Sequence, residues 1–470
     1  MTRKIVVNPV TRISGFMEIQ ADVEDNRVVD ARTEGLFFRG FEKMLVGRNP
    51  FDAVYFTQRI CGICSTAHSM ASSLALEDAM GIVPSEQGRY LRDIIHGCEF
   101  LQNHIRHFYQ YTMPDFVKLP ENYPLFRAEH SDFRLPDEKN ERLVKDYFDS
   151  LDISRSAHEM LAVLGGKAPH NHGVFIDGIT TQATIDKIIK IKSILHSIYQ
   201  FIHQRMLPDV YIIAEYYSDY FSIGGGCGNL LSFGCFNGYR TLGTLYVNPL
   251  VYTGGVMRAF NPENITEEID YAWYKVGQSS EKPFKTDPEA DMGKPGAYSW
   301  IKAPRYNNLP FETGPLARQW LSGEYRNGLS TMDRTIARVL EAGKIVSVMN
   351  TLLENLEPGV SVQKEYHIPA SAAGKGLIDT TRGALGHWLK IDDKVISFYQ
   401  IITPSAWNLS PRSSNETLGT AEQALVGTSV RDINNPVELG RIIRSFDPCI
   451  SCATHVYTGG KHVNTIKLLH

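Results

Sequence analysis

The sequence predicts an α+β protein that is predominantly α-helical, with a large helical core, a small N-terminal antiparallel sheet and long ordered loops. Three observations support this prediction. Residues 1–35 alternate apolar and polar side chains with the period of a half-buried strand. Beyond residue 52 the apolar side chains recur with a helical period. Residues 236–313 mix short strand-like runs with stretches rich in Pro, Gly and Asp, which is typical of ordered loops.

The elements are expected in the following order. Asp25-Asn26 makes a turn between two strands of the N-terminal sheet. The clearest helix spans 85–111, where Leu91, Ile94 and Leu101 share one face. Other helices are expected at 52–58, 66–80, 153–164, 181–206, 209–221, 317–356, 422–426 and 437–446, and two short strands around 383–388 and 396–402. The charged, proline-bearing residues 114–141 are expected to form a surface excursion.

Bulk composition indicates an ordinary soluble globular protein. The 470 residues can bury a large core, and 43% are hydrophobic and 21% charged. A net charge of −4 gives no reason to expect a nucleic-acid partner. No apolar run approaches about 18 residues, so we expect no direct membrane span. Residues 1–9 are basic but lack a long apolar stretch, so we expect no secretory signal.

Two Cys-x-x-Cys pairs stand near opposite ends of the chain. One contains Cys61 and Cys64, and the other contains Cys449 and Cys452. Four converging thiolates would make a soft metal site. A structural Cys₄ zinc site is the ordinary interpretation of such spacing, although zinc pairs usually lie within a few tens of residues of each other. A redox disulfide needs only one pair.

The three other cysteines are scattered, at positions 98, 227 and 235. We expect them to behave as small buried hydrophobes. An odd total of seven indicates a reducing compartment.

The residues around the cysteines carry a resemblance to a known family. The motifs are RICGICSTAH (59–68) and DPCISCATH (447–455), with PVTRI (9–13), FRGFE (38–42), KAPRY (302–306), GPLAR (314–318), TRGALGHW (381–388) and TPSAWN (403–408) between or before them. Together, and in this order, they resemble the large, catalytic subunit of nickel–iron hydrogenases over nearly the whole chain.

The resemblance implies one large catalytic domain over 1–470. Its parts would be 1–35 (N-terminal sheet), 52–235 (helical core with the first cysteine pair), 236–313 (loop-rich), 314–455 (helices and strands with the second pair) and 456–470 (a C-terminal extension). Family maturation usually cuts after the histidine that matches His455, so the extension is either retained or marks a precursor.

The resemblance also implies the metal ligands. Cys61 and Cys449 would bind nickel terminally, while Cys64 and Cys452 would bridge nickel to an iron that carries cyanide and carbon monoxide. Thiolates suit a soft metal, and bridging sulfurs let two metals share electron density.

Three further side chains match family positions beside this Ni–Fe(CN)₂(CO) centre. Arg382 and Ser405 would donate hydrogen bonds to the diatomic ligands, and His68 would lie near a bridging thiolate. Other interpretations stay open, because Arg382 could form a buried ion pair with Asp447 and His68 could be a core histidine.

A second, hard-metal site, usually Mg²⁺, would be formed by Glu42, His455 and a backbone carbonyl near Ile401. A hard cation accepts carboxylate and carbonyl oxygens readily. Taken alone, Glu42 would be read as a salt-bridged surface carboxylate.

The implied reaction is H₂ ⇌ 2H⁺ + 2e⁻. The Cys449 thiolate would take the proton, with the Arg382 guanidinium above the metals and Asp447 as its counter-charge. The remaining cysteines cannot hold an Fe–S cluster in this chain. An iron–sulfur small subunit is therefore expected as partner, with further electron-transfer subunits carrying flavin or Fe–S clusters. A hydrogen sensor of the same build is the alternative function.

Two residues depart from the family pattern. Ser14 stands where the family usually has a Glu that passes protons, so protons would pass either through the Ser14 hydroxyl with water or through another acid such as Glu18. Asn103 stands where many members have Asp, and it cannot counter the charge of Arg382. The similarity favours a cytoplasmic location, with export or membrane attachment through a partner subunit as the alternative.

Overall fold

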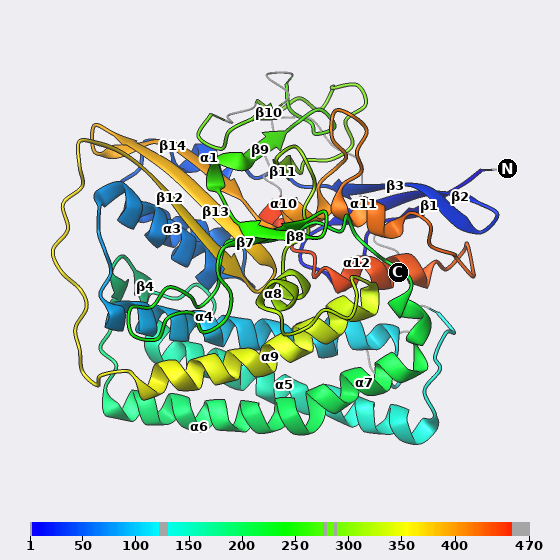
Figure 1. Cartoon of the computed structure of the whole chain (residues 1–470), viewed down its shortest axis with the longest axis horizontal. Coiled ribbons are helices and arrows are strands. Elements are labelled where there is room, and N and C mark those ends of the chain that lie inside the picture. Colours follow the sequence, from blue (N-terminus) through cyan, green and yellow to red (C-terminus); the bar gives the residue numbers. More distant parts are fainter. Residues whose placement is uncertain (1, 122–129, 276–279, 286–288, 454–470) are drawn as a thin grey trace.

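The computed structural model describes residues 2–121, 130–275, 280–285 and 289–453, with only the backbone described at 452 and 453 (Figure 1). A layer of long helices forms one half of the molecule. It consists of α4 (Glu86–Arg106), α5 (Asp137–Gly165), α6 (Ile185–Phe201) and α9 (Thr331–Glu354). Their apolar faces meet in the largest hydrophobic cluster of the described chain. The predicted helical core is therefore confirmed.

Two of the long helices, α4 and α9, begin at residues whose side chains cap them. Ser85 Oγ accepts a hydrogen bond from the backbone N–H of Gly88 at the start of α4. Ser330 and Asp333 form a reciprocal capping box at the start of α9. Such caps satisfy backbone donors that have no partner inside the helix.

The remaining helices are shorter. They are α1 (Phe41–Leu45), α2 (Asp52–Phe56), α3 (Ser65–Met80), α7 (Leu207–Tyr216), α8 (Pro315–Ser322), α10 (Pro404–Leu409), α11 (Thr420–Leu425), α12 (Val437–Ser445) and α13 (Ile450–Ala453). Short 3₁₀ or π turns occur at η1 (Thr57–Ile60), η2 (His107–Thr112), η3 (Met113–Asp115), η4 (Ile202–Met206), η5 (Ser218–Phe221) and η6 (Pro262–Asn264).

The expected N-terminal sheet is present and antiparallel, with β2 (Met17–Glu24) between β1 (Arg3–Val7) and β3 (Arg27–Gly35). Its inward side chains pack against α11 and α12. This packing places the N-terminal segment next to the C-terminal helices.

A second three-stranded sheet is larger than the sequence indicated. Two short strands were expected in this region, but β12 (Ser371–Thr380), β13 (Gly383–Asp392) and β14 (Val395–Ile402) form a full antiparallel meander. The first of these strands was missed because its small and polar residues show no apolar run. It packs on α3, and a Cβ at Gly376 would lie 2.0 Å from the Ala71 carbonyl oxygen. Only glycine permits this close contact.

The short strands form three small sheets, with the orders β4-β5, β6-β7-β8 and β10-β9-β11. They are β4 (Val174–Phe175), β5 (Gly178–Ile179), β6 (Leu230–Ser232), β7 (Leu250–Thr253), β8 (Val256–Ala259), β9 (Ile265–Glu268), β10 (Ser280–Glu281) and β11 (Ala303–Tyr306).

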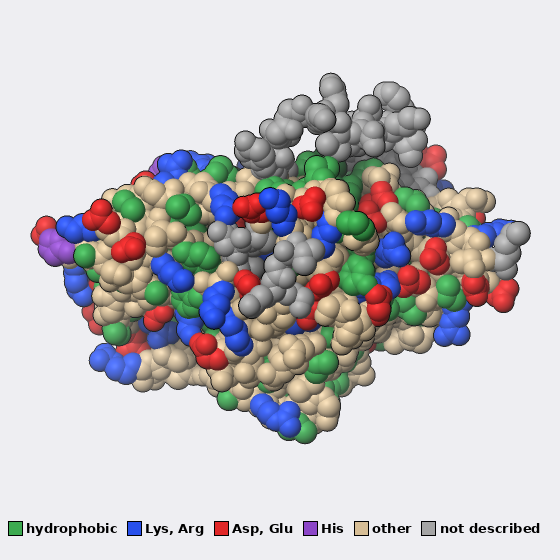
Figure 2. All heavy atoms as spheres, turned by 90° about the horizontal axis from the view of Figure 1, so that it is seen from above, with side chains coloured by type: hydrophobic (Ala, Val, Ile, Leu, Met, Phe, Trp, Pro, Cys, Tyr) green, Lys and Arg blue, Asp and Glu red, His purple; other side chains and the backbone are tan. Residues whose placement is uncertain are grey.

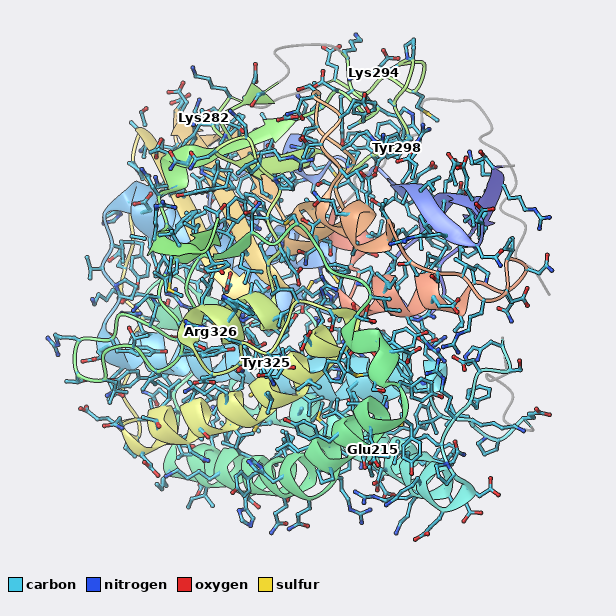
Figure 3. All side chains as sticks on the ribbon, turned by 45° about the vertical axis from the view of Figure 1, so that its right-hand side comes forward. Glu215, Lys282, Lys294, Tyr298, Tyr325 and Arg326 are labelled. Atoms are coloured by element: carbon cyan, nitrogen blue, oxygen red, sulfur yellow. The ribbon has the colours of Figure 1, made fainter. Side chains whose placement is uncertain are left out.

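Two of the predicted helices differ most from those observed. The helix expected at 153–164 begins at Asp137, so the surface excursion ends earlier than residue 141. The helix expected at 317–356 is divided into α8 and α9. Gly323 ends α8 with φ 86°, and Tyr325, which Figure 3 labels, lies in the connecting segment. The hydroxyl of Tyr325 donates to Asp333 at 2.6 Å.

No helix among the described residues is both long and apolar enough to cross a lipid bilayer. On the face seen in Figure 2, acidic and basic side chains are interspersed. No field of a single sign therefore covers the described part of this face.

Candidate metal centre

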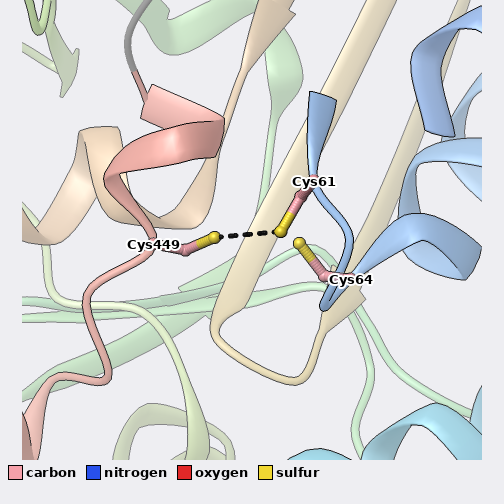
Figure 4. A group of neighbouring side chains, drawn as sticks. All are labelled: Cys61, Cys64 and Cys449. Carbon is pink, nitrogen blue, oxygen red and sulfur yellow. Dashed lines mark hydrogen bonds between the residues drawn. The ribbon is translucent and has the colours of Figure 1, made fainter. Parts of the chain in front are cut away.

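Three cysteine sulfurs from opposite ends of the chain meet in the interior. Cys61 and Cys64 lie between η1 and α3, and Cys449 lies just before α13 (Figure 4). Their ligand atoms all lie within 4.8 Å of one another, and the sulfurs of Cys61 and Cys449 are 3.3 Å apart. All three cysteines are buried. Sulfurs that share one metal at about 2.3 Å each lie at most roughly 4.6 Å apart, and the spacing of this group is close to that limit or below it, as a shared metal ion requires.

The first cysteine pair is held by the helices next to it. Cys64 is the N-cap residue of α3. The buried carboxylate of Glu99, on α4, accepts hydrogen bonds from the backbone N–H groups of Thr66 at 2.7 Å and Ala67 at 3.0 Å. Burial raises the pKa of Glu99 to about 7, against the lowering effect of these bonds. Two of the free N–H groups at the start of α3 are thus satisfied from a neighbouring helix.

The second pair is held by segments distant in sequence. The backbone of Ser14 forms a parallel bridge with Cys449, and the N–H of Ile450 donates to the Ser14 carbonyl at 2.7 Å. A Cβ at Gly15 would lie 2.6 Å from the backbone nitrogen of Ser451, so glycine is required beside Ser14.

A serine on α10 also contacts the second pair. The Cys449 N–H donates to Ser405 Oγ at 2.9 Å. Ser405, predicted as a cofactor-binding residue, therefore lies beside Cys449.

Arg39 connects the two cysteine segments directly. Its Nη2 group donates to the carbonyl oxygen of Ile60, next to Cys61, and to the carbonyl oxygen of Ser451, between the cysteines of the second pair. Sequence reasoning did not assign Arg39 a role, although it stands within the FRGFE motif.

Arg382 projects from the turn between β12 and β13 into a buried charge network. Its Nη2 lies 3.0 Å from Asp447 Oδ1 and donates to Asn103 Oδ1 at 2.8 Å, and its Nε donates to the Asp447 carbonyl at 3.0 Å. Asn103 Nδ2 donates in turn to Asp447 Oδ2 at 2.8 Å. Arg338, which the sequence analysis missed, lies 3.2 Å from the same carboxylate oxygen. Asp447 therefore supplies the counter-charge that Asn103 cannot.

Burial alone would raise the pKa of Asp447, but Arg382, His107 and Arg338 hold it below the usual range. Burial opposes the charge of Arg382 as well, yet Asp447 and the nearby cysteines raise its pKa well above the usual value. Asp447 also adopts φ 56°, a left-handed conformation that Asp tolerates better than most residues. This backbone turn directs both its side chain and its carbonyl toward Arg382.

The residues present fit a metal carrying small ligands. Arg382 Nη1 is buried and has no hydrogen-bond partner among the described residues, so one donor is left for a bound group. A small cavity beside the sulfurs is lined by Cys64, Ala67, His68, Thr380, Arg382, Leu385, Pro404, Ser405 and Cys449. Its mainly apolar wall keeps the donors of Arg382 and Ser405 away from bulk water.

His68, on α3, faces this cavity and also hydrogen-bonds a second histidine. Its Nδ1 lies 3.1 Å from Nε2 of His387, which belongs to the TRGALGHW motif. Ser14 makes a side-chain contact of its own with the second pair, because its Oγ lies 3.5 Å from Ser451 Oγ.

The residues predicted for a hard metal lie on neighbouring elements. Glu42 is in α1, which packs against β14, the strand that carries Ile401. Glu267, which the sequence analysis missed, is buried, and its charge interacts with that of Glu42. Lys302 Nζ lies 3.1 Å from Glu267, and Gln400 donates to the same carboxylate. The side chain of Cys452, His455 and the extension 456–470 lie outside the described residues.

Comparison with known proteins identifies the family of this chain. The family model of nickel-dependent hydrogenases matches residues 39–124, 122–328 and 321–455. The chain belongs to the nickel-dependent hydrogenase family. It is 35% identical to the periplasmic [NiFeSe] hydrogenase large subunit of Desulfomicrobium baculatum, covering 98% of this chain and 97% of the relative. It is 29% identical to the hydrogenase-2 large chain of Escherichia coli K12 over the whole of both chains.

Solved structures show the same fold. The [NiFeSe] hydrogenase of Desulfovibrio vulgaris Hildenborough in the reduced state superposes with a TM-score of 0.93 at 37% identity, over 97% of this chain and all of the other. This hydrogenase chain is thus a large, catalytic subunit, an oxidoreductase that acts on H₂ at a nickel–iron centre and passes electrons to a small subunit. The predicted α+β fold and family are confirmed.

Proposed function

We propose that Cys61, Cys64, Cys449 and Cys452 hold an Ni–Fe(CN)₂(CO) centre, in which the first and third bind nickel and the other two bridge to iron. The convergence of three buried sulfurs beside the unpaired Arg382 Nη1 carries this proposal. When bound, such a centre supplies an open position for H₂ and a path for two electrons. Metal analysis should find nickel and iron together, and infrared spectra should show cyanide and carbonyl bands. Zinc alone would refute the assignment.

The protein's own residues then move the proton. We propose that the Cys449 thiolate accepts it from H₂, close to the charge of Arg382, which Asp447 fixes in place. Buried donors from Arg382 and Ser405 would bind the small ligands of the centre and exclude water.

Ser14 is proposed as the next proton carrier. Its backbone bridge to Cys449 and its contact with Ser451 support this role. Glu18 and Glu34 face each other directly across β2 and β3 beyond it, and burial raises the pKa of Glu34 to about 7. A carboxyl group of that pKa can carry a proton near neutral pH.

Isotope exchange tests this route. Ser14→Ala should slow exchange between H₂ and D₂O, and unchanged exchange would exclude Ser14 as a relay. Ser14→Glu should raise the rate if proton transfer limits the native protein. Thr2→Ala, on a side chain that contacts only exposed Glu24 in the described part of the chain, is the matched control.

We also propose a hard divalent metal, such as Mg²⁺, bound by Glu42, His455 and the carbonyl of Ile401. The position of Glu42 beside Glu267, with Lys302 and Gln400 around it, supports a cation with an ordered water shell. Glu42→Gln should lower the magnesium content while nickel is retained. Equal magnesium in variant and wild type would exclude this ligand.

The chain is proposed to work as one catalytic unit, because its two cysteine motifs belong to opposite ends. Further electron-transfer subunits carrying flavin or Fe–S clusters are proposed beyond the small subunit. The periplasmic location of the Desulfomicrobium baculatum relative supports export or membrane attachment through a partner, the second of the two locations expected from the sequence. Cell fractionation followed by detection of the chain distinguishes this from a cytoplasmic location.

A further inference from the structure

A buried arginine and glutamate form a paired contact behind the turn that carries Arg382. Arg318, the last residue of the GPLAR motif on α8, donates from Nε to Oε1 of Glu341 on α9 and from Nη2 to its Oε2, each at 2.7 Å. Both side chains are 0% exposed. Two parallel charge-assisted bonds fix the plane of the guanidinium as well as its position. Because α8 lies between α9 and the second sheet, the pair joins the helical layer to the sheet (Figure 1).

The rest of the Arg318 guanidinium holds the backbone next to Arg382. Its Nη1 donates to the carbonyl oxygen of Thr380 at 2.8 Å, and its Nη2 donates to that of Thr381 at 3.4 Å. These two residues directly precede Arg382. A Cβ at Gly314, just before α8, would lie 2.9 Å from the Arg382 carbonyl oxygen, so the backbones of the two segments are in close contact. The turn is therefore held from α8.

Glu341 also reaches the counter-charge of Arg382 by a second route. Nε2 of His104, on α4, lies 2.7 Å from Glu341 Oε2. Arg338 Nη1 lies 3.4 Å from His104 Nδ1 and 3.2 Å from Asp447 Oδ2. Burial lowers the pKa of His104 to about 4, so its ring is neutral and carries a single N–H. Because an arginine can only donate, Nδ1 accepts from Arg338 and Nε2 donates to Glu341, and every bond along this route has one donor and one acceptor.

The Glu341 carboxylate is saturated by its partners. Burial alone would raise its pKa, but Arg318 and His104 hold this pKa below its usual range. Its two oxygens accept two hydrogen bonds from Arg318, one from His104 and one from the Tyr246 hydroxyl. An amide of the same size offers only one accepting oxygen, so it cannot replace the carboxylate in this arrangement.

We propose that Glu341 is a positioning residue for the reaction with H₂, because it anchors both the turn that carries Arg382 and the counter-charge, Asp447. The proposal rests on the proposed function, in which Arg382 Nη1 donates to a small ligand of the metal centre. Glu341 itself lies behind the turn and acts only through its two routes. Removing its charge should leave the metals in place and misdirect the Arg382 donor, and small errors of placement at a reacting centre are costly.

Glu341→Gln is the direct test, in the purified complex of the large and small subunits. The amide keeps the size of the side chain, but an NH₂ group replaces one accepting oxygen and Arg318 loses its paired partner. The cyanide infrared bands should shift and broaden, because the Arg382 donor is no longer held in one position. Exchange between H₂ and D₂O should fall about 10-fold or more, the effect of losing a hydrogen bond from a charged donor, while nickel and iron content is unchanged.

Glu77→Gln is the matched control. Glu77 forms another buried, paired contact, with Nη1 and Nη2 of Arg92 at 2.6 Å and 3.2 Å, and its hydrogen bonds in the described chain do not reach the Arg382 turn. This variant should lower the midpoint of denaturant unfolding as Glu341→Gln does, yet keep the wild-type infrared bands and exchange rate. Bands and exchange in Glu341→Gln that match those of Glu77→Gln would overturn the proposal.

Where Glu341→Gln does not take up metal, Arg318→Lys provides the test. Lysine keeps the charge beside Glu341 but has a single nitrogen in place of the fork that binds the carbonyls of Thr380 and Thr381. The cyanide bands should again shift, and unshifted bands with full nickel and iron content would overturn the proposal. Absence of cyanide and carbonyl bands in the wild type would instead refute the proposed centre itself.

Discussion

The first cysteine pair is anchored by its own helix and the helix that follows, whereas the second is anchored by three separate segments, one of them from the far end of the chain. Glu99 reaches α3 from the adjacent α4, so the first pair depends on local packing. The backbone of Ser14, the hydroxyl of Ser405 and the charge of Arg382 all converge on the second pair. One half of the metal site is therefore formed by the helical core, and the other half exists only when remote parts of the fold have docked.

The largest effect is expected when one sulfur is removed from each cysteine pair. Cys61→Ser and Cys449→Ser should both abolish H₂/D₂O exchange, because each removes a proposed nickel ligand. Nickel content of the purified protein should fall in both variants. Cys98→Ala, at a buried free cysteine on α4, is the control and should retain exchange. Exchange that survives in either ligand variant would contradict a shared site.

The next largest effect should come from the charge that secures the second pair. Asp447→Asn leaves Arg382 and Arg338 buried without a counter-charge, and we expect a cost of about 3–5 kcal/mol in the free energy of unfolding. Glu99→Gln, at the first pair, leaves one backbone donor unsatisfied and should cost about 1–3 kcal/mol. Denaturant unfolding of the metal-free chain measures both values. Equal costs would show that the two sides do not differ in their anchoring.

Arg39 should stabilise the folded chain by linking the two cysteine segments. Arg39→Met removes the hydrogen bonds to Ile60 and Ser451, at a cost of about 1.5–3 kcal/mol, since both involve a charged donor. Arg48→Met, in a nearby exposed arginine that contacts neither segment in the described residues, should change stability by less than about 0.5 kcal/mol. Nickel uptake and the free energy of unfolding together test this prediction. Identical values for the two variants would show that Arg39 does not link the two cysteine segments.

A change in pH should have a smaller effect on the free energy of unfolding. Burial raises the pKa of Glu99, beside the first pair, and of Glu422, on α11 beside the N-terminal sheet, each to about 7. The folded chain then keeps protons that the unfolded chain has released. The stability that each protonated carboxyl group contributes is fully present below about pH 4.5 and is lost as the pH rises through 7. The free energy of unfolding should fall by at most about 1.4 kcal/mol per pH unit for each group.

Unfolding of the metal-free chain between pH 5 and 8 measures this slope. Glu99→Gln and Glu422→Gln should each flatten it by a similar amount. A slope that survives both changes would assign the pH dependence to other groups.

Several residues of the site could be predicted because they lie in short sequence motifs. Three of the four paired cysteines (Cys61, Cys64 and Cys449), Arg382 with Asp447, and Ser405 were all identified from motifs, and the structure brings them together. Glu99, Arg338 and Glu267 were missed, since a lone buried carboxylate or arginine in a helical or loop-rich segment has no sequence signal. The strand β12 was missed for a related reason, because its glycines serve the contact with α3 and not an apolar pattern.

The sequence by itself determined the chemical types at the centre. Thiolates in paired spacing, a proline after Asp447 and helical periodicity around the first pair require no knowledge of distance. Only the tertiary structure decided which partners these groups receive. Asn103 became a bridge between Arg382 and Asp447, and His387 became the neighbour of His68. Such pairs lie hundreds of residues apart, so their separation is set by the packing of helices on sheets and cannot be derived from the order of residues along the chain.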